Sequence, residues 1–241
     1  MVRHTLLWPS WLLLLARSVQ ANTEKTIFKA PPVINMPTQP PTLDSLGLDI
    51  LTPDVSSLRT RVQANFPDEA SPGGPATWLL LYNLTASQRY EMRVCWAATQ
   101  PTSFTLDTYE LDEVFETPEL ITSLAVYSQI RHLTPDGVAG KATPPIQLDR
   151  HGHGDIQASV LFLRILAKAD YFSDDEARMS LVEPVNVDLI LDPYVLNVLP
   201  RSLAPTAAYI TAVAALAVFL SQYVRSRIHG PSVVPVAKKS Q

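Results

Sequence analysis

Cysteine and glycine are scarce in this sequence of 241 residues, and each shortage excludes a kind of architecture. The single cysteine, Cys95, rules out a disulfide framework within the chain, which needs at least one pair. We expect Cys95 to be a small buried apolar residue, the alternative being a disulfide to a partner. The chain has only 8 glycines but 21 prolines. Proline is disfavoured in helix interiors and in central strands. We therefore expect many extended segments and turns, folded around a hydrophobic core without covalent support.

Charge and catalytic motifs are also sparse. The 19 basic and 23 acidic residues give a formal net charge of -4, and no basic patch indicates a nucleic acid partner. The sequence has neither a glycine-rich phosphate loop nor the Gly-x-Ser-x-Gly pattern of a nucleophilic serine. We therefore predict no catalytic residue, no cofactor and no metal site.

One cluster does contain side chains that could bind a metal, namely His151, His153 and Asp155. The cluster is flanked by glycines and has no second histidine pair nearby, so a solvated loop is favoured over a metal site. The carboxylates of residues 107–116 and 174–176 are expected on the surface rather than in a paired acid–base site.

Residues 1–21 have the organisation of a secretory signal peptide. A basic start precedes a short apolar stretch, and small residues stand before a cleavage site between Ala21 and Asn22. Pro9 and Arg17 interrupt the stretch and leave it too short to span a bilayer. A cleaved signal peptide is therefore favoured over an uncleaved anchor.

Residues 204–224 form a second long apolar segment, and none of them is charged. About 20 helical residues cross the hydrocarbon core of a bilayer, so the segment fits one transmembrane helix. The arginines that follow, Arg225 and Arg227, place the C-terminal side in the cytosol. We predict a lumenal domain over 22–203 and a cytosolic tail over 225–241. A GPI-attachment signal, the alternative, ends in its apolar stretch, whereas a polar segment follows here.

Small residues repeat along the predicted transmembrane helix at four-residue spacing. Such a spacing lets a second helix approach closely, which drives helix association in lipid. We predict a helix-packing face for a partner, the alternative being that alanine is simply common in such spans. The face consists of Ala204, Ala208, Ala212, Ala207, Thr211 and Ala215.

The tail ends in Lys238 and Lys239 followed by two further residues. On a cytosolic tail, this spacing matches the dilysine signal through which coat proteins return membrane proteins to the endoplasmic reticulum (ER). We therefore predict ER residence, the alternative being a solvated basic end.

The lumenal segment is predicted to be mostly β and sandwich-like, with one or two short helices. Residues 22–75 are rich in proline and are expected to be partly irregular. In 89–96, apolar side chains alternate with Arg89, Glu91 and Arg93, which predicts a half-buried strand with one polar face. A helix is expected from Thr117 to about Ile130. Further strands are predicted at 26–29, 58–62, 76–82, 104–109, 158–167 and 182–191.

Asn83, followed by Leu84 and Thr85, forms the one glycosylation sequon of the chain. Because it lies in a predicted strand connection on the lumenal side, we expect Asn83 to carry a glycan, the alternative being a role in the turn alone. The passage from this sequon to Tyr90 is similar to the corner of fibronectin-III-like sandwiches, with Tyr90 as the corner tyrosine.

Residues 78–85, 89–96 and 97–104 together resemble the core block of the fungal co-activator of GPI mannosyltransferase II. The layout is also similar: a small ER protein with a lumenal β domain and one C-terminal span. The resemblance implies a non-catalytic subunit whose partner is the polytopic transferase that adds the second mannose to the GPI precursor. It carries over no catalytic residues.

Three other classes remain as alternatives. A subunit of an ER membrane-insertion or translocon-associated complex shares the same layout. A p24-like cargo receptor is disfavoured, because residues 192–203 are too short for a coiled-coil stalk and residues 226–241 contain no aromatic. An anchored lumenal enzyme is disfavoured by the missing catalytic motif.

Overall fold

The computed structural model describes residues 22–36, 42–69, 71–133 and 156–228. The chain forms two compact units, residues 1–193 and residues 194–241. Several predicted features lie outside the described residues: the signal peptide up to Ala21, the His151–Asp155 cluster, and the two lysines of the tail.

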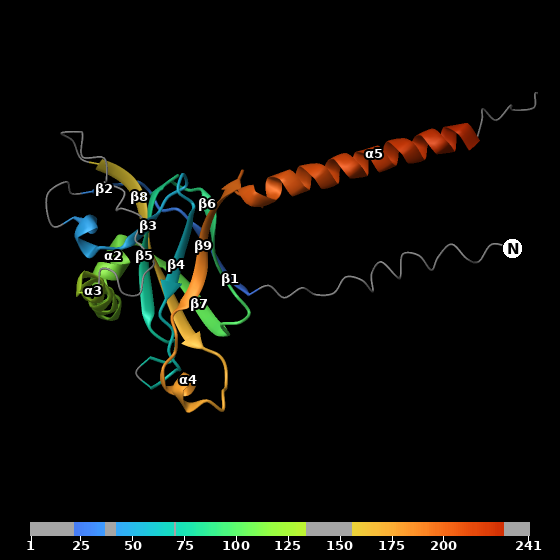
Figure 1. Ribbon diagram of the computed structural model, residues 1–241. Coiled ribbons are helices and arrows are strands. Elements are labelled where there is room, and N and C mark those ends of the chain that lie inside the picture. Colours follow the sequence, from blue (N-terminus) through green and yellow to red (C-terminus); the bar gives the residue numbers. More distant parts are fainter. Residues whose placement is uncertain (1–21, 37–41, 70, 134–155, 229–241) are drawn as a thin grey trace, which may run out of the picture. The chain divides into compact units, whose positions relative to one another are not determined.

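The first sheet has five antiparallel strands (Figure 1). Four of them pair in the order β1-β6-β9-β4, and the short fifth strand, β10 (Leu199–Pro200), pairs with the end of β9. Successive side chains of a strand point to opposite faces, so Tyr90, Met92 and Val94 all enter the core. Val185, Val187, Leu189 and Leu191 do the same in β9, and the predicted alternation of both strands is confirmed. The strands are β1 (Thr23–Lys29), β6 (Arg89–Trp96), β9 (Val185–Val195) and β4 (Ser57–Val62).

The second sheet is built around β8, the longest of the described strands. β8 pairs antiparallel with β5 along one edge, and with β2 and β7 at different points of its length. β3 adds to β5 in parallel. The strands are β2 (Ile34–Met36), β3 (Asp49–Leu51), β5 (Ala76–Leu84), β7 (Thr102–Tyr109) and β8 (Ile156–Ala169).

Two hydrophobic cores follow from this arrangement. One lies between the sheets and contains side chains from both, including Leu79, Leu163 and Leu189. The other lies on the opposite face of the second sheet, where Trp78, Leu80 and Phe162 pack against helices. The apolar runs of β5 and β8 thus bury both of their faces, as central strands of a layered fold do.

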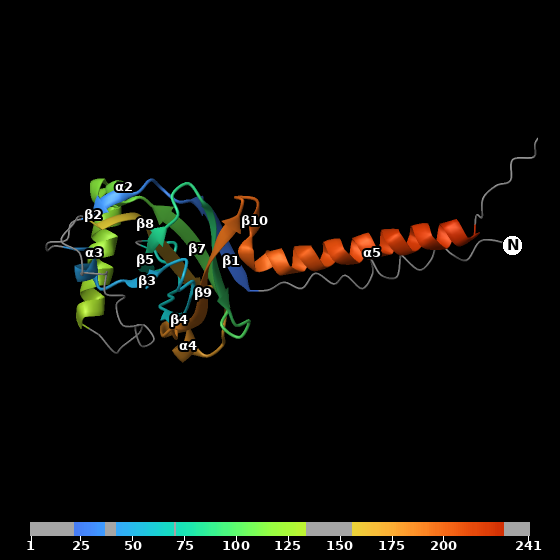
Figure 2. The same ribbon diagram turned by 90° about the horizontal axis from the view of Figure 1, so that it is seen from above.

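The helices that cover the second core are α2 (Leu111–Glu116) and α3 (Pro118–Leu133). Figure 2 shows them on the side of the second sheet that faces away from the first. The predicted start of α3 is confirmed, since the carbonyl of Thr117 accepts hydrogen bonds from the amides of Leu120 and Ile121 at 3.1 Å. A sandwich of two sheets with a few helices confirms the predicted fold class. Among the described residues, the first unit also contains the short helices η1 (Leu43–Leu46) and α4 (Glu176–Ser180).

Two expectations need correction. Glu91 does not face solvent: it is 4% exposed, because Lys25 and Arg93 cover its carboxylate at 3.1 and 3.3 Å. Cys95 is half-buried rather than buried, and its sulfur accepts a hydrogen bond from Thr23 Oγ1 at 3.6 Å.

The second unit begins with the end of β9 and returns through β10 (Leu199–Pro200) as a short hairpin. A single turn, η2 (Arg201–Leu203), leads into α5 (Ala204–Ile228). The helical stretch from Arg201 to Ile228 is long and apolar enough to cross a membrane.

Candidate functional site

Helix α3 is attached to the second sheet by two polar contacts in addition to its apolar packing. Near its middle, the indole Nε1 of Trp78 donates a hydrogen bond to Ser123 Oγ at 3.1 Å. At its C-terminal end, the guanidinium of Arg131 holds both carboxylate oxygens of Asp49 at 2.9 and 3.0 Å. The pair is largely buried and bidentate, which fixes orientation as well as distance. Together, the two contacts set the angle at which α3 crosses β5.

Tyr127 lies between these two contacts, and its surroundings keep it neutral. Burial raises the pKa of the Tyr127 phenol, and the nearby Arg131 offsets the increase only in part. Burial also disfavours the charge of Arg131, but Asp49 and Tyr127 outweigh this effect and raise the pKa of the guanidinium. The side of α3 next to β5 therefore presents an uncharged ring beside a charge that is already paired.

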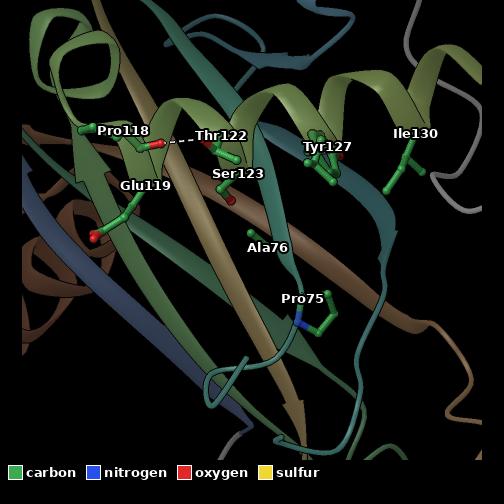
Figure 3. A pocket seen from close by; sticks show the side chains of 9 residues that line it. Pro75, Ala76, Pro118, Glu119, Thr122, Ser123, Tyr127 and Ile130 are labelled. Atoms are coloured by element: carbon green, nitrogen blue, oxygen red, sulfur yellow. Dashed lines mark hydrogen bonds between the residues drawn. The ribbon is translucent and has the colours of Figure 1, made fainter. Parts of the chain in front are cut away.

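An open groove of about 690 Å³ runs between α3 and the start of β5. Figure 3 shows Ser123, Tyr127 and Ile130 on the side of the helix that faces Pro75 and Ala76. Glu119 lies at the N-terminal end of the groove, where Thr122 Oγ1 donates to the carbonyl of Pro118 at 2.6 Å. The apolar walls and floor are formed mainly by Pro75, Ala76, Val126, Tyr127 and Ile130.

The groove exists because the apolar side of α3 is wider than the sheet beneath it. Leu120 and Leu124 face the core, whereas Val126 and Ile130 are displaced around the helix and stay about half exposed. The sheet cannot reach them, because β5 begins only at Ala76 after a tight turn. In that turn Gly74 has a φ of +81°, and a Cβ there would lie 2.0 Å from the carbonyl oxygen of Ala167. The turn therefore stays close to β8 and leaves the groove open.

The segment that contains α2 and most of α3 is negatively charged, and one of its carboxylates, Glu119, lines the groove. Residues 110–130 contain five carboxylates and no lysine or arginine. All five side chains are exposed, and no ion pair to them is found among the described residues. They are Glu110, Asp112, Glu113, Glu116 and Glu119. An apolar groove with an acidic end thus suits an apolar segment that carries positive charge.

The predicted packing face of the second unit lies on α5. Its six small residues form two series with four-residue spacing, Ala204-Ala208-Ala212 and Ala207-Thr211-Ala215, which are offset by three residues and so share one side of the helix as a stripe. Thr211 Oγ1 donates to the carbonyl of Ala207 at 2.8 Å, so the hydroxyl is satisfied within the helix. The stripe therefore offers a narrow apolar surface to a neighbouring helix.

The predicted sequon lies where β5 departs from regular pairing. The register between β5 and β8 shifts between Leu81 and Leu84, and Asn83 sits in this irregularity with a φ of +56°. Its side chain is exposed, as is that of Thr85. Tyr90 takes the corner role that was predicted, since its hydroxyl accepts the amide hydrogen bond of Thr85 at 3.0 Å and donates to Gln88 at 3.1 Å.

The structure does not bring all predicted residues together. Asn83 belongs to the first unit and the six small residues to the second, and the tail lysines lie outside the described residues. Within the described ranges, no group of three or more His, Cys, Asp or Glu side chains could hold a metal ion. Sequence reasoning missed the groove, although Val126 and Ile130 lie off the spacing of Leu120 and Leu124 and could have suggested a second apolar side of the helix.

Comparison with known families supplies the remaining information. The model of the GPI-mannosyltransferase II co-activator family matches residues 12–134, slightly over half of the chain. The match ends just after α3, so it includes every residue that lines the groove. Neither a curated protein nor a solved structure matches the chain.

Proposed function

The chain belongs to the GPI-mannosyltransferase II co-activator family, and we propose that it is a non-catalytic accessory subunit of that transferase in the ER membrane. In this role it supports the addition of the second mannose to the GPI precursor. The observation that carries the proposal is the family match, which spans the strands and helices from β1 to α3.

A type I topology is part of the proposal. The helix α5 serves as the membrane span, the first unit lies in the ER lumen, and residues 225–241 face the cytosol. The uncharged stretch 204–224 and the arginines after it support this orientation. Lys238 and Lys239 serve as the retrieval signal read by coat proteins, and Asn83 carries a glycan. Changing both lysines to serine should move the protein out of the ER, and an unchanged location would contradict the signal.

The groove beside α3 is proposed to bind a lumenal segment of the transferase. The segment would place aliphatic side chains against Val126, Tyr127 and Ile130, and lysine or arginine near the acidic end of the groove. Burying apolar surface supplies affinity, and the exposed carboxylates supply attraction and orientation. In the membrane, the small-residue stripe of α5 would pack against a helix of the same partner.

Depletion of the protein tests the function. We expect a GPI precursor with a single mannose to accumulate, since the transferase would lack its co-activator. Normal precursors after depletion would contradict the proposal, and a concurrent loss of newly made multispan proteins would favour a membrane-insertion complex instead.

Complementation of the depleted cells tests the groove. The double variant Val126→Gln, Ile130→Gln removes the apolar wall and keeps helix-forming residues. The variant Ile121→Gln is the matched control, because Ile121 is also exposed on α3 but does not line the groove. We expect the double variant to lose co-purification with the transferase and to accumulate the one-mannose precursor, while the control restores both. Equal restoration by both variants would exclude the groove as a contact and leave the accessory role in place.

A further inference from the structure

The hairpin at the start of the second unit has a turn that its sequence does not favour. Its connection is Leu196–Val198, and the amide of Val198 donates to the carbonyl of Val195 at 3.1 Å. Both central residues of this turn are left-handed, Leu196 with a φ of +53° and Asn197 with a φ of +58°. Asparagine and glycine adopt such angles readily, whereas a leucine there is strained. The backbone conformation of the turn therefore does not explain why a leucine stands at position 196.

The exposure of the Leu196 side chain to water is also unfavourable. Leu196 is 90% exposed and Val198 is 78% exposed, and the flanking Val195 and Leu203 are about half exposed. The described part of the second unit offers these side chains no apolar neighbour that buries them. An exposed apolar patch of this kind marks a surface that contacts a protein partner or a membrane.

The neighbouring sequence indicates that the patch contacts the membrane. Only η2 separates the hairpin from the candidate span α5, and both belong to one compact unit (Figure 2). From Tyr194 to Val224 the chain contains one charged residue, Arg201, which lies between the hairpin and the helix. A lone arginine between an apolar tip and a span suits the level of the lipid phosphates, where its charge stays solvated.

We propose that the β9–β10 hairpin inserts Leu196 and Val198 into the lumenal headgroup–acyl boundary of the bilayer that α5 crosses. The occupant of this surface is lipid, and Arg201 pairs with lipid phosphate beside it. Insertion would bury the two exposed side chains and give the strained leucine a function. The inference rests on the proposed membrane span but not on any contact with the transferase.

The test uses the full chain in phosphatidylcholine nanodiscs, without transferase. In a Cys95→Ser background, an environment-sensitive fluorophore is attached at Val198→Cys, at Ala215→Cys within the span, or at Leu181→Cys. Leu181 is a matched control, because it is an exposed leucine of the first unit. Lipids carrying a nitroxide near the headgroup end or near the methyl end of the acyl chain then report depth by quenching.

We expect the label at 198 to emit at shorter wavelength than the label at 181 and to be quenched most by the shallow nitroxide. The label at 215 should be quenched most by the deep one. Adding Leu196→Asn should abolish the quenching at 198 while thermal stability stays equal or rises, because asparagine suits the turn. A variant that lost stability would instead show that Leu196 serves the fold, and the inference would fall.

The remaining outcomes separate the inference from the proposed topology. If the label at 215 is quenched but the label at 198 behaves like that at 181, the hairpin stays in water and only this inference is overturned. If the label at 215 is not quenched either, the span itself is wrong and both fall. If Leu196→Asn leaves the quenching at 198 unchanged, Leu196 does not anchor the hairpin.

Discussion

The outer faces of the two sheets differ: one carries paired charges, and the other is apolar and covered by helices. On the first sheet, charged side chains from neighbouring strands pair with one another, with Glu91 between Lys25 and Arg93, and Arg59 beside Asp188. On the second sheet the outer face is apolar, and Trp78 and Phe162 need helices to cover them. The charged face thus pairs its charges within the sheet, whereas the apolar face is covered by a layer of helices.

This difference explains why the candidate contact surface lies on the second side. Cross-strand ion pairs satisfy one another and leave little for a partner to bind. A helix laid on an apolar sheet has an apolar side of its own, and in α3 that side extends past the sheet to Val126 and Ile130. The exposed carboxylates of the same helices have no partner among the described residues, unlike those of the first sheet.

The largest expected loss of stability comes from a substitution at the centre of the helix-covered face of the second sheet. Trp78 is fully buried, with its ring near Tyr109 and Phe162 and its indole bonded to Ser123. Trp78→Ala should lower the free energy of unfolding by about 3–5 kcal/mol, because it leaves a cavity under α3. Denaturant unfolding of the full chain in detergent, followed by near-UV circular dichroism, measures the loss.

The variant Trp78→Phe separates packing from the polar contact. It keeps most of the ring volume and removes the hydrogen bond to Ser123, so its cost should be clearly smaller than that of the alanine. If both variants cost the same, the hydrogen bond rather than the packing holds α3, and the apolar face would not be the dominant feature of this side.

A smaller effect compares two carboxylates, one from each face. Glu91→Gln removes a buried charge that the exposed Lys25 and the half-buried Arg93 share, and should cost about 1–3 kcal/mol of unfolding free energy. Glu116→Gln on α2 removes an exposed charge without a described partner and should stay within about 0.5 kcal/mol. The same denaturant measurement compares them. Equal costs would mean that the acidic helices hold structural ion pairs and that the two faces are alike.

Much of this contrast could be predicted from the sequence, because it follows from local periodicity. The alternation in 89–96 and 182–191 predicts which side chains enter the core, and the predominantly apolar runs of 76–82 and 158–167 predict buried strands. The threonine–proline pair at 117–118 predicts the start of α3. These signals need only neighbours a few residues apart.

What could not be predicted depends on register and crossing angle. Glu91 is buried because the pairing of β1 with β6 brings Lys25 beside it from 66 residues away. The helix α2 has a single buried side chain, Val114, among acidic residues, so it lacks a periodic apolar signal. The groove also depends on how α3 crosses β5, and the pair Arg131–Asp49 fixes this crossing over 82 residues of sequence. Contacts between residues so far apart in the sequence cannot be predicted from the pattern of a short segment.

The smallest effect concerns the exposed edge of the charged face. Arg59 Nε and Nη2 bind the two carboxylate oxygens of Asp188 at 2.7 and 2.8 Å. The hydrogen bond from Arg59 holds the pKa of Asp188 below its usual value, although burial acts in the opposite direction. Arg59→Gln should therefore raise the titration midpoint of the Asp188 carboxyl, followed by carboxyl carbon NMR of the full chain, toward that of an ordinary aspartate.

The sign of the pH dependence follows from the direction of that pKa. Because the folded pKa of Asp188 is the lower one, the pair stabilises the fold above the unfolded pKa of about 4, and this contribution is lost as pH falls through the folded value. Both side chains are solvated, so salt should weaken the effect, and the loss of stability should be small compared with that of Glu91→Gln. Arg59→Lys keeps the charge without the two-bond geometry and should give an intermediate midpoint. An Asp188 midpoint that is the same in all three proteins would mean that the pair does not form in solution. The charged face would then rest on the partly buried Glu91 network alone.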